Sequence, residues 1–285
     1  MAPENPAPPR PARPRHLVLL IALAVLCVTV PFMGWQATWF GRRLTNQEIE
    51  RYLRDNDHPR KIQHALSQIS DRMLRGDPAV AAWYPQIASL ARCPLAPIRN
   101  TAAWVMGQDN RSDAFHRALL GLLRDSDVMV RRNAALSLVR FGDSAGRPEL
   151  VAILRPYTVR SPAAGTVEIL VRAGQQVGAG TSLAHLTTNE KETIDVRSPF
   201  AGRAFDVDAA VRKPIAAGSP IASLSPESSQ VWEALRALYI VGGTEDLPEV
   251  ERQSRAAGGM PEEVRQQAAL TAQAIRMRSE RGPTR

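Results

Sequence analysis

The residues of this chain that could do chemistry are few and scattered. Its histidines and cysteines show neither metal-ligand spacing nor a partner at motif distance. A glycine-rich stretch could suggest a phosphate loop, but no Gly-Lys-Ser/Thr follows it and no helix begins there. Its glycines are therefore interpreted as turn residues. We expect no catalytic and no metal site among these residues: His16, His58, His64, His116, His185, Cys27, Cys93, Gly174, Gly178 and Gly180.

One lysine is distinguished by its place between two copies of a motif. The sequence Ser-Pro-x-Ala-Gly begins at Ser161 and again at Ser198, 37 residues later. Each copy is followed by a second shared element with a turn glycine, at 177–183 and at 215–221. Lys191 lies between the two halves, in a short polar stretch.

Strand signals account for this repeated pattern. Apolar residues alternate over 167–171, glycine and proline recur at short spacing, and helical periodicity is absent. One half could not bury its apolar face alone, so two halves would pack face to face as a flattened barrel. Residues 158–226 resemble the biotinyl/lipoyl domain, also called the barrel-sandwich hybrid.

The resemblance implies a specific role for Lys191, which stands where this family carries its attachment lysine. Glu190 matches the acidic residue of the lipoyl form, whereas Glu192 replaces a small residue and the methionines of the biotinyl form are absent. Lys191 would then carry lipoyl or biotin as an amide. The alternative is a solvated turn lysine with no cofactor, which we favour because the N-terminus suggests export.

The N-terminal segment 17–40 carries no charge. At about 1.5 Å per residue, this length spans a bilayer core of about 30 Å. Trp35, Trp39 and Phe40 cluster at its end like an interfacial aromatic belt. No small-x-small cleavage site follows, so we predict an uncleaved transmembrane helix over 17–40, preceded by a disordered, proline-rich cytoplasmic tail over 1–16.

The charges that flank this segment are nearly balanced, because arginines both precede and follow it. A long C-terminal body is translocated largely regardless of its charge. We therefore expect a single-pass protein of the bacterial inner membrane, in contact with the lipid bilayer, whose body faces the periplasm. A reversed topology would restore the carrier interpretation of Lys191.

A second repeat lies outside the strand-rich segment. A pattern of Val or Ile, polar residues and paired alanines occurs at 98–104, 130–136 and 264–270, each time opening a helical periodicity. Small alanines permit close helix packing, and repeats of this length indicate a solenoid of helix pairs. The run 122–143 resembles HEAT repeats. Trp83, Tyr84 and Trp104 are predicted to be core residues.

The spacing of the repeats predicts how the parts are joined. The distance from Val130 to the weaker copy at Val231 exceeds one repeat by about the length of the strand-rich segment. We therefore expect an α+β fold in which an all-β module is inserted into a helical solenoid. The predicted parts are HEAT-like repeats over 44–157, the barrel-sandwich module over 158–226, HEAT-like repeats over 229–278 and a disordered tail over 279–285.

The net charge of +8 and the arginines of the repeats raise the question of nucleic-acid binding. No nucleic-acid motif is found, and the basic residues are interspersed with acidic ones. The repeat arginines are expected to bond within or between repeats, so no nucleic-acid partner is predicted.

The whole arrangement resembles periplasmic adaptor, or membrane fusion, proteins, although their helical hairpin and their following small barrel are missing. We expect a non-catalytic adaptor or accessory subunit that docks onto an envelope transporter or another membrane complex. The alternatives are a lipoyl or biotinyl carrier modified on Lys191 and an assembly scaffold of a membrane complex.

Overall fold

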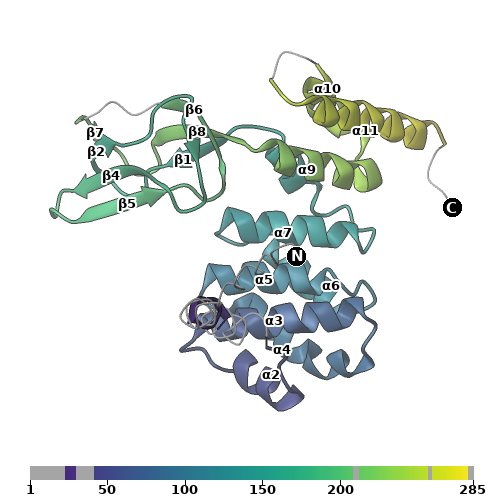
Figure 1. Ribbon diagram of the computed structural model, residues 1–285. Coiled ribbons are helices and arrows are strands. Elements are labelled where there is room, and N and C mark those ends of the chain that lie inside the picture. Colours follow the sequence, from purple (N-terminus) through teal and green to yellow (C-terminus); the bar gives the residue numbers. More distant parts are fainter. Residues whose placement is uncertain (1–22, 30–41, 208–211, 256–258, 282–285) are drawn as a thin grey trace, which may run out of the picture.

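The computed structural model describes residues 23–29, 42–207, 212–255 and 259–281. Within these residues, a first set of helices is followed by short strands and then by a second set of helices. Figure 1 shows the helices of both sets stacked in one column, from which the strands project as a separate lobe. This mixed content confirms the expected α+β class.

The first helical set is built from short helices with clear local start signals. Proline occupies the first turn of several of them, where its missing N–H costs nothing, and Asp127 caps one by accepting hydrogen bonds from two backbone N–H groups. The helices are α2 (Asn46–Leu53), α3 (Pro59–Leu74), η1 (Pro78–Trp83), α4 (Tyr84–Ser89), η2 (Leu90–Arg92), α5 (Ala96–Met106), α6 (Asp113–Leu122), α7 (Val128–Val139) and α8 (Arg147–Ile153).

The paired alanines of the repeats bring α5 and α7 close together, as predicted. Ala102 and Ala103 on α5 and Ala134 on α7 are fully buried. The approach is close enough for the Ser137 hydroxyl to donate a hydrogen bond to the Ala103 carbonyl at 2.9 Å. Small side chains at the contact let the Ser137 side chain of α7 reach the backbone of α5.

The strand lobe consists of two four-stranded antiparallel sheets. One has the order β1-β8-β6-β3 and the other β5-β4-β2-β7, so each half of the repeated sequence contributes strands to both sheets. Apolar side chains alternate into the space between the sheets. The strands are β1 (Tyr157–Arg160), β2 (Gly165–Ile169), β3 (Gln176–Val177), β4 (Ser182–Thr188), β5 (Thr193–Arg197), β6 (Gly202–Val207), β7 (Pro214–Ile215) and β8 (Pro220–Pro226).

The serines of the two motif copies have the same structural role. The Ser161 hydroxyl donates to the Ala163 carbonyl at 2.7 Å, and the Ser198 hydroxyl donates to the Phe200 carbonyl at the same distance. Both serines are buried. A hydroxyl that donates to a backbone carbonyl two residues ahead stabilises a tight turn. This explains why serine and proline stand just before β2 and again just before β6.

The motif glycines are equivalent as well. A Cβ atom on Gly165 would lie 2.4 Å from the Thr187 carbonyl oxygen, and one on Gly202 would lie 2.4 Å from the Ser225 carbonyl oxygen. In each half the neighbouring strand approaches the glycine backbone too closely for any side chain. The sequence repeat is therefore a repeat of structure.

The chain enters and leaves the strand lobe side by side, because β1 and β8 pair antiparallel with Tyr157 opposite Leu224. Glu227 alone separates β8 from the second helical set. This set continues the column of the first (Figure 1). It comprises α9 (Ser228–Val241), η3 (Thr244–Asp246), α10 (Leu247–Ser254) and α11 (Glu262–Arg281).

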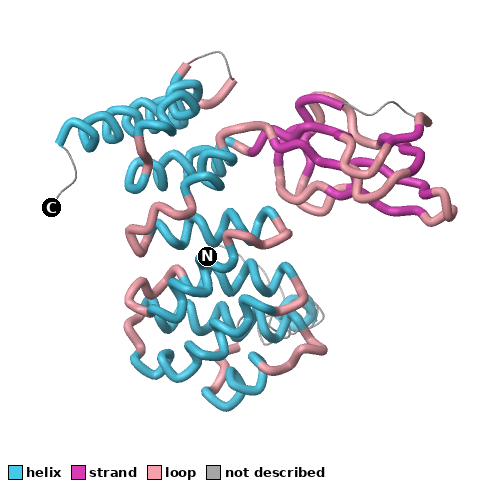
Figure 2. The backbone as a smooth tube through the Cα atoms, turned by 180° about the vertical axis from the view of Figure 1, so that it is seen from behind, coloured by secondary structure: helices cyan, strands magenta, loops and turns pink. Residues whose placement is uncertain are grey.

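Helix α7 belongs to all three hydrophobic clusters of the fold. Leu138 packs in the cluster of the first helical set, Val139 in that of α8 to α11, and Val128 in that of the strand lobe. Figure 2 shows the column and the strand lobe from behind, with the lobe joined to the column at the level of α9. Because α7 contacts neighbours in all three clusters, each of its residues is at least partly buried.

The predicted transmembrane segment 17–40 lies mostly outside the described residues, as does the predicted tail over 1–16. Within the described part of the chain, every helix is too short or too polar to cross a membrane. The C-terminal tail was predicted to begin at 279, but α11 continues through Arg281. The Arg278 guanidinium donates to the Gly242 carbonyl at 2.9 Å and so fastens this last part of α11 to the end of α9.

Candidate docking groove and hairpin lysine

Lys191, the predicted attachment residue, lies in the turn between β4 and β5. Its backbone has φ 64°, in the left-handed region, and its N–H donates to the Thr188 carbonyl at 3.0 Å. The flanking Glu190 and Glu192 are exposed, as is the lysine itself. Figure 1 places this turn at the end of the strand lobe farthest from the helices. The amine is therefore presented to solvent at the tip of a projecting hairpin.

Three of the four described histidines lie on the solenoid, and two of them are held by a carboxylate. The His58 imidazole lies 2.8 Å from an Asp55 carboxylate oxygen. The His116 imidazole lies 2.7 Å from one of Asp143. Burial lowers the pKa of His64, which favours its neutral form. The carboxylate partners of His58 and His116 and the burial of His64 are typical of structural histidines.

The other candidate metal and redox residues stay apart. His185 on β4 lies 3.9 Å from Asp195 at the surface of the strand lobe. Cys93 is partly buried in the solenoid, Cys27 lies in the exposed helical piece at 23–29, and His16 lies outside the described residues. Among the residues that the structure describes, no group of three His, Cys, Asp or Glu side chains could hold a metal ion.

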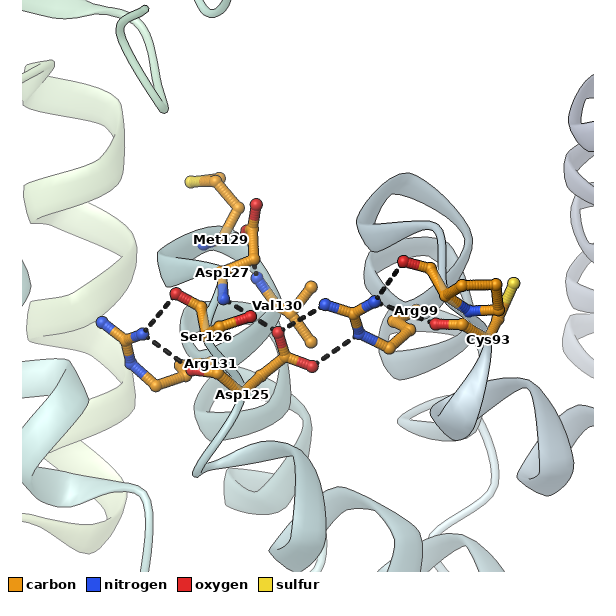
Figure 3. A network of polar contacts seen from close by, with 9 residues as sticks. Cys93, Arg99, Asp125, Ser126, Asp127, Met129, Val130 and Arg131 are labelled. Atoms are coloured by element: carbon orange, nitrogen blue, oxygen red, sulfur yellow. Dashed lines mark hydrogen bonds and ion pairs between the residues drawn. The ribbon is translucent and has the colours of Figure 1, made fainter. Parts of the chain in front are cut away.

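The repeat arginines form a ladder between helices, as expected (Figure 3). The Arg99 guanidinium makes two hydrogen bonds to the Asp125 carboxylate, at 2.6 and 2.7 Å. Arg131, its counterpart in the next repeat, donates to the Asp125 backbone carbonyl at 2.8 Å and also to Glu149. Asp125 thus joins two successive repeats, and both arginines are committed to the fold.

Arg132 occupies the junction between the solenoid and the strand lobe. Its side chain is only 3 % exposed. The guanidinium lies over the Phe200 ring, with its carbon 4.2 Å from the ring centroid, and donates to the Gln230 side chain at 3.2 Å. Gln230 in turn donates to the Ala201 carbonyl at 2.9 Å. Desolvation lowers the pKa of Arg132 to about 10.

A hollow opens on the face of the column where α5, α7 and α9 meet. The prediction that Trp104 is a core residue was wrong, because 45 % of its side chain is exposed here, whereas Trp83 is buried as predicted. The flanking residues of α5 fill the core, so Trp104 falls at the edge of the apolar stripe. The hollow is lined by Trp104, Gln108, Asn133, Leu136, Ser137, Val139, Arg140, Glu233, Arg236, Ala237 and Ile240.

Helix α9 carries a second apolar surface beside this hollow. Trp232, Tyr239 and Ile240 are 38 %, 47 % and 58 % exposed, although Val231 and Leu238 on the other side of the same helix are fully buried. A second hollow lies on the side of α9 that faces α11, and Trp232 lines it. Large apolar side chains that gather on one exposed face mark an interaction surface. Of the two hollows, the first, between α5, α7 and α9, is called the docking groove from here on.

Sequence reasoning missed this groove, although part of its signal was local. In α9, large residues stand at 232, 236 and 240, a helical spacing that runs opposite the buried stripe. A helix with apolar residues on two faces contacts more than its own repeat. No sequence signal indicated that Trp104 and Leu136 line the groove. Helix α9, which completes the groove, lies next to α7 in space but is separated from it in the sequence by the whole strand lobe.

Comparison with known proteins confirms the predicted HEAT repeats. Residues 85–167, from α4 into β2, match a family model of HEAT repeats. A search of curated proteins found no match. Among solved structures, the chain is similar to one described as a single-chain, multi-domain long-chain acyl-CoA carboxylase, with 18 % identity and a TM-score of 0.24. That alignment covers 36 % of this chain and 11 % of the carboxylase chain.

Proposed function

We propose that this protein is a non-catalytic adaptor, or accessory subunit, that docks onto an envelope transporter or another membrane protein complex. The observation that carries the proposal is the docking groove, where Trp104 and Ile240 stay exposed on a helical column whose other large apolar residues are mostly buried. Exposed aromatic side chains around a hollow favour protein contacts over chemistry. The setting of the described histidines supports the non-catalytic part of the proposal.

We assign the strand lobe to the barrel-sandwich class. The support is the equivalent geometry of its two halves. Ser161 and Ser198 each donate to the carbonyl two residues ahead, and Gly165 and Gly202 each lie against a carbonyl oxygen of the neighbouring strand. In this proposal the lobe is a second docking surface that projects from the column. The carboxylase alignment does not bear on this assignment, because its TM-score is low.

The proposed location is the bacterial inner membrane, with residues 17–40 as a single span and the body in the periplasm. The support is the uncharged segment itself and the aromatic residues at its end. A reporter that is active only in the periplasm, fused to the C-terminus, tests this orientation. If a second reporter that is active only in the cytoplasm is active at the same C-terminal site, the topology is the reverse.

Site-specific photo-crosslinking in intact membranes tests docking. A benzophenone amino acid is placed at Ile240 in the docking groove and, as a matched control, at Arg117, which is exposed on α6 outside the groove. We expect one defined adduct with a membrane protein from position 240 and none from position 117. Equal adducts from both positions, or none from either, would contradict docking through this groove.

A second candidate function is favoured by the geometry of Lys191. An exposed amine at a hairpin tip is accessible to an attaching enzyme, so the protein could be a lipoyl or biotinyl carrier. Intact-protein mass spectrometry of the chain from its native host separates the candidates, with Lys191→Arg as the control. The adaptor proposal expects the unmodified mass. An added lipoyl or biotinyl mass that is lost in Lys191→Arg would establish the carrier.

A further inference from the structure

The docking groove has a chemistry that selects among partners. We infer that it receives an acidic amphipathic segment of a partner protein, with apolar side chains on one face and carboxylates beside them. The inference rests on the proposed docking function and names the chemical class of the docked segment.

Part of the groove lining is apolar. Leu136 and Val139 on α7 and Ala237 on α9 belong to it, together with the exposed Trp104 and Ile240. Burying these exposed side chains under a partner would remove apolar surface from water, which favours association by roughly 25 cal/mol per Å² before the entropic cost of binding. A purely polar or highly charged segment would forfeit this contribution.

The cations of the groove lack carboxylate partners. The Arg236 guanidinium lies over the Trp232 ring, 4.8 Å from its centroid, and the Arg140 guanidinium donates to the Gly107 carbonyl and the Gln108 side chain. Within the described residues neither guanidinium forms an ion pair, whereas Arg99 and Arg131 elsewhere in the column are paired with acids. Two arginines against one carboxylate, that of Glu233, leave the groove positive.

Arginine guanidinium groups bind carboxylates through paired N–H donors, and such charge-assisted bonds are stronger than neutral ones. The Arg236 guanidinium is already oriented by its stacking on Trp232, so less rotamer entropy is lost when it binds. Carboxylates of a partner that lie beside its apolar anchors would meet both arginines at the rim.

The groove extends along α7 for a length that a short helix could follow. On α7 the lining residues run from Asn133 to Arg140, which is about two turns or roughly 10 Å of helix. A helix that lies in a groove between helices presents its anchors at three- and four-residue spacing. A peptide of about four turns would therefore cover the groove with both ends free.

The test uses two synthetic peptides of about 14 residues and the full-length chain in detergent micelles. Both peptides carry Leu at helical spacing; one has Glu at the flanking positions and the other has Lys. Fluorescence anisotropy at low salt should show the Glu peptide bound at least tenfold more tightly than the Lys peptide. In Arg140→Glu/Arg236→Glu the preference should reverse in favour of the Lys peptide.

Matched variants separate recognition from loss of structure. Arg75→Glu/Arg117→Glu makes the same charge change at exposed positions outside the groove and should keep the wild-type preference within about twofold. Arg236→Glu alone avoids the Arg140 backbone bonds and should still weaken the Glu peptide about tenfold, which corresponds to ~1.4 kcal/mol. A Glu peptide that fails to bind, or that binds all variants equally, overturns the inference.

Three further outcomes show which proposal has failed. If the benzophenone at Ile240 captures a membrane protein and the Glu peptide does not compete, docking stands and the acidic segment is rejected. If position 240 captures nothing, docking through the groove is rejected, and the acidic segment with it. If sedimentation shows a dimer that Trp104→Ala and Arg236→Glu dissociate, the groove is occupied by a second copy, and the acidic partner is again rejected.

Discussion

The guanidinium carbon of Arg132 on α7 lies 4.2 Å from the centroid of the Phe200 ring. The same guanidinium donates to the side chain of Gln230 on α9, which in turn donates to the Ala201 carbonyl of the strand lobe. The residue that corresponds to Phe200 in the first motif copy is Ala163, which has no aromatic ring. The second copy therefore faces the solenoid. A buried cation against an aromatic face fixes the direction in which the lobe projects.

Replacing Arg132 separates packing from charge. Arg132→Met keeps the volume and removes a desolvated charge, so we expect a free energy of unfolding within about 1 kcal/mol of wild type or higher. Arg132→Ala leaves a cavity and should cost about 2–4 kcal/mol. Urea unfolding measures both. A loss in Arg132→Met as large as that in Arg132→Ala would show that the charge itself stabilises the junction.

The same residue predicts a dependence on alkaline pH. Because burial lowers the pKa of Arg132 to about 10, the unfolded chain binds this proton more tightly than the folded chain does. Its contribution to stability therefore rises as pH increases from about 10 toward the unfolded value. The difference in unfolding free energy between wild type and Arg132→Met should shift in favour of wild type over this range. A constant difference would contradict the prediction.

The equivalence of the motif glycines can be tested directly. Gly165→Ala and Gly202→Ala each place a Cβ atom 2.4 Å from a backbone carbonyl oxygen, so each should destabilise the protein by about 2–3 kcal/mol. Gly121→Ala, on α6 with open space around it, should instead stabilise by about 0.5–1 kcal/mol. Thermal unfolding compares the three variants. A large difference between the first two would show that the halves are not equivalent.

The inter-repeat ladder makes the solenoid sensitive to acid. Hydrogen bonds from Arg99 hold the pKa of Asp125 below its usual value. The stabilisation is therefore complete above the unfolded pKa of about 4 and is lost as pH falls through the lower folded value. Asp125→Asn should cost about 2–4 kcal/mol at pH 7 and much less at pH 2.

A surface pair provides the control for this prediction. The ion pair between Arg54 and Glu50 is mostly exposed, so Glu50→Gln should cost less than about 0.5 kcal/mol at either pH. A double-mutant cycle with Arg99→Met isolates the ladder itself. Additive effects of Asp125→Asn and Arg99→Met would contradict the coupling.

The backbone of Lys191 predicts a gain in stability on replacement. An L-residue at φ 64° is strained and glycine is not, so Lys191→Gly should stabilise the hairpin by about 0.5–1 kcal/mol. Lys191→Arg keeps the strain and should leave stability unchanged. Chemical denaturation measures both. A destabilised Lys191→Gly would show that the side chain contributes contacts that outweigh the strain.

Several features could be predicted from the sequence because each is encoded locally. The paired alanines and the arginines of the repeats predicted close helix packing and bonds between repeats, and Ala103, Arg99 and Asp125 confirm both. The HEAT repeats are confirmed over 85–167. These patterns survive in a single sequence because each repeat contacts mainly its neighbours, so the same residue types recur at the same spacing.

The amino-acid sequence by itself thus determined where helices and strands alternate and which short motifs are repeated. Only the tertiary structure decided that Trp104 on α5 is exposed and that Arg132 on α7 is buried. The reason is physical: burial at these positions depends on α9 and the strand lobe, which reach α7 from far along the chain. Periodicity within one helix carries no information about such a distant neighbour.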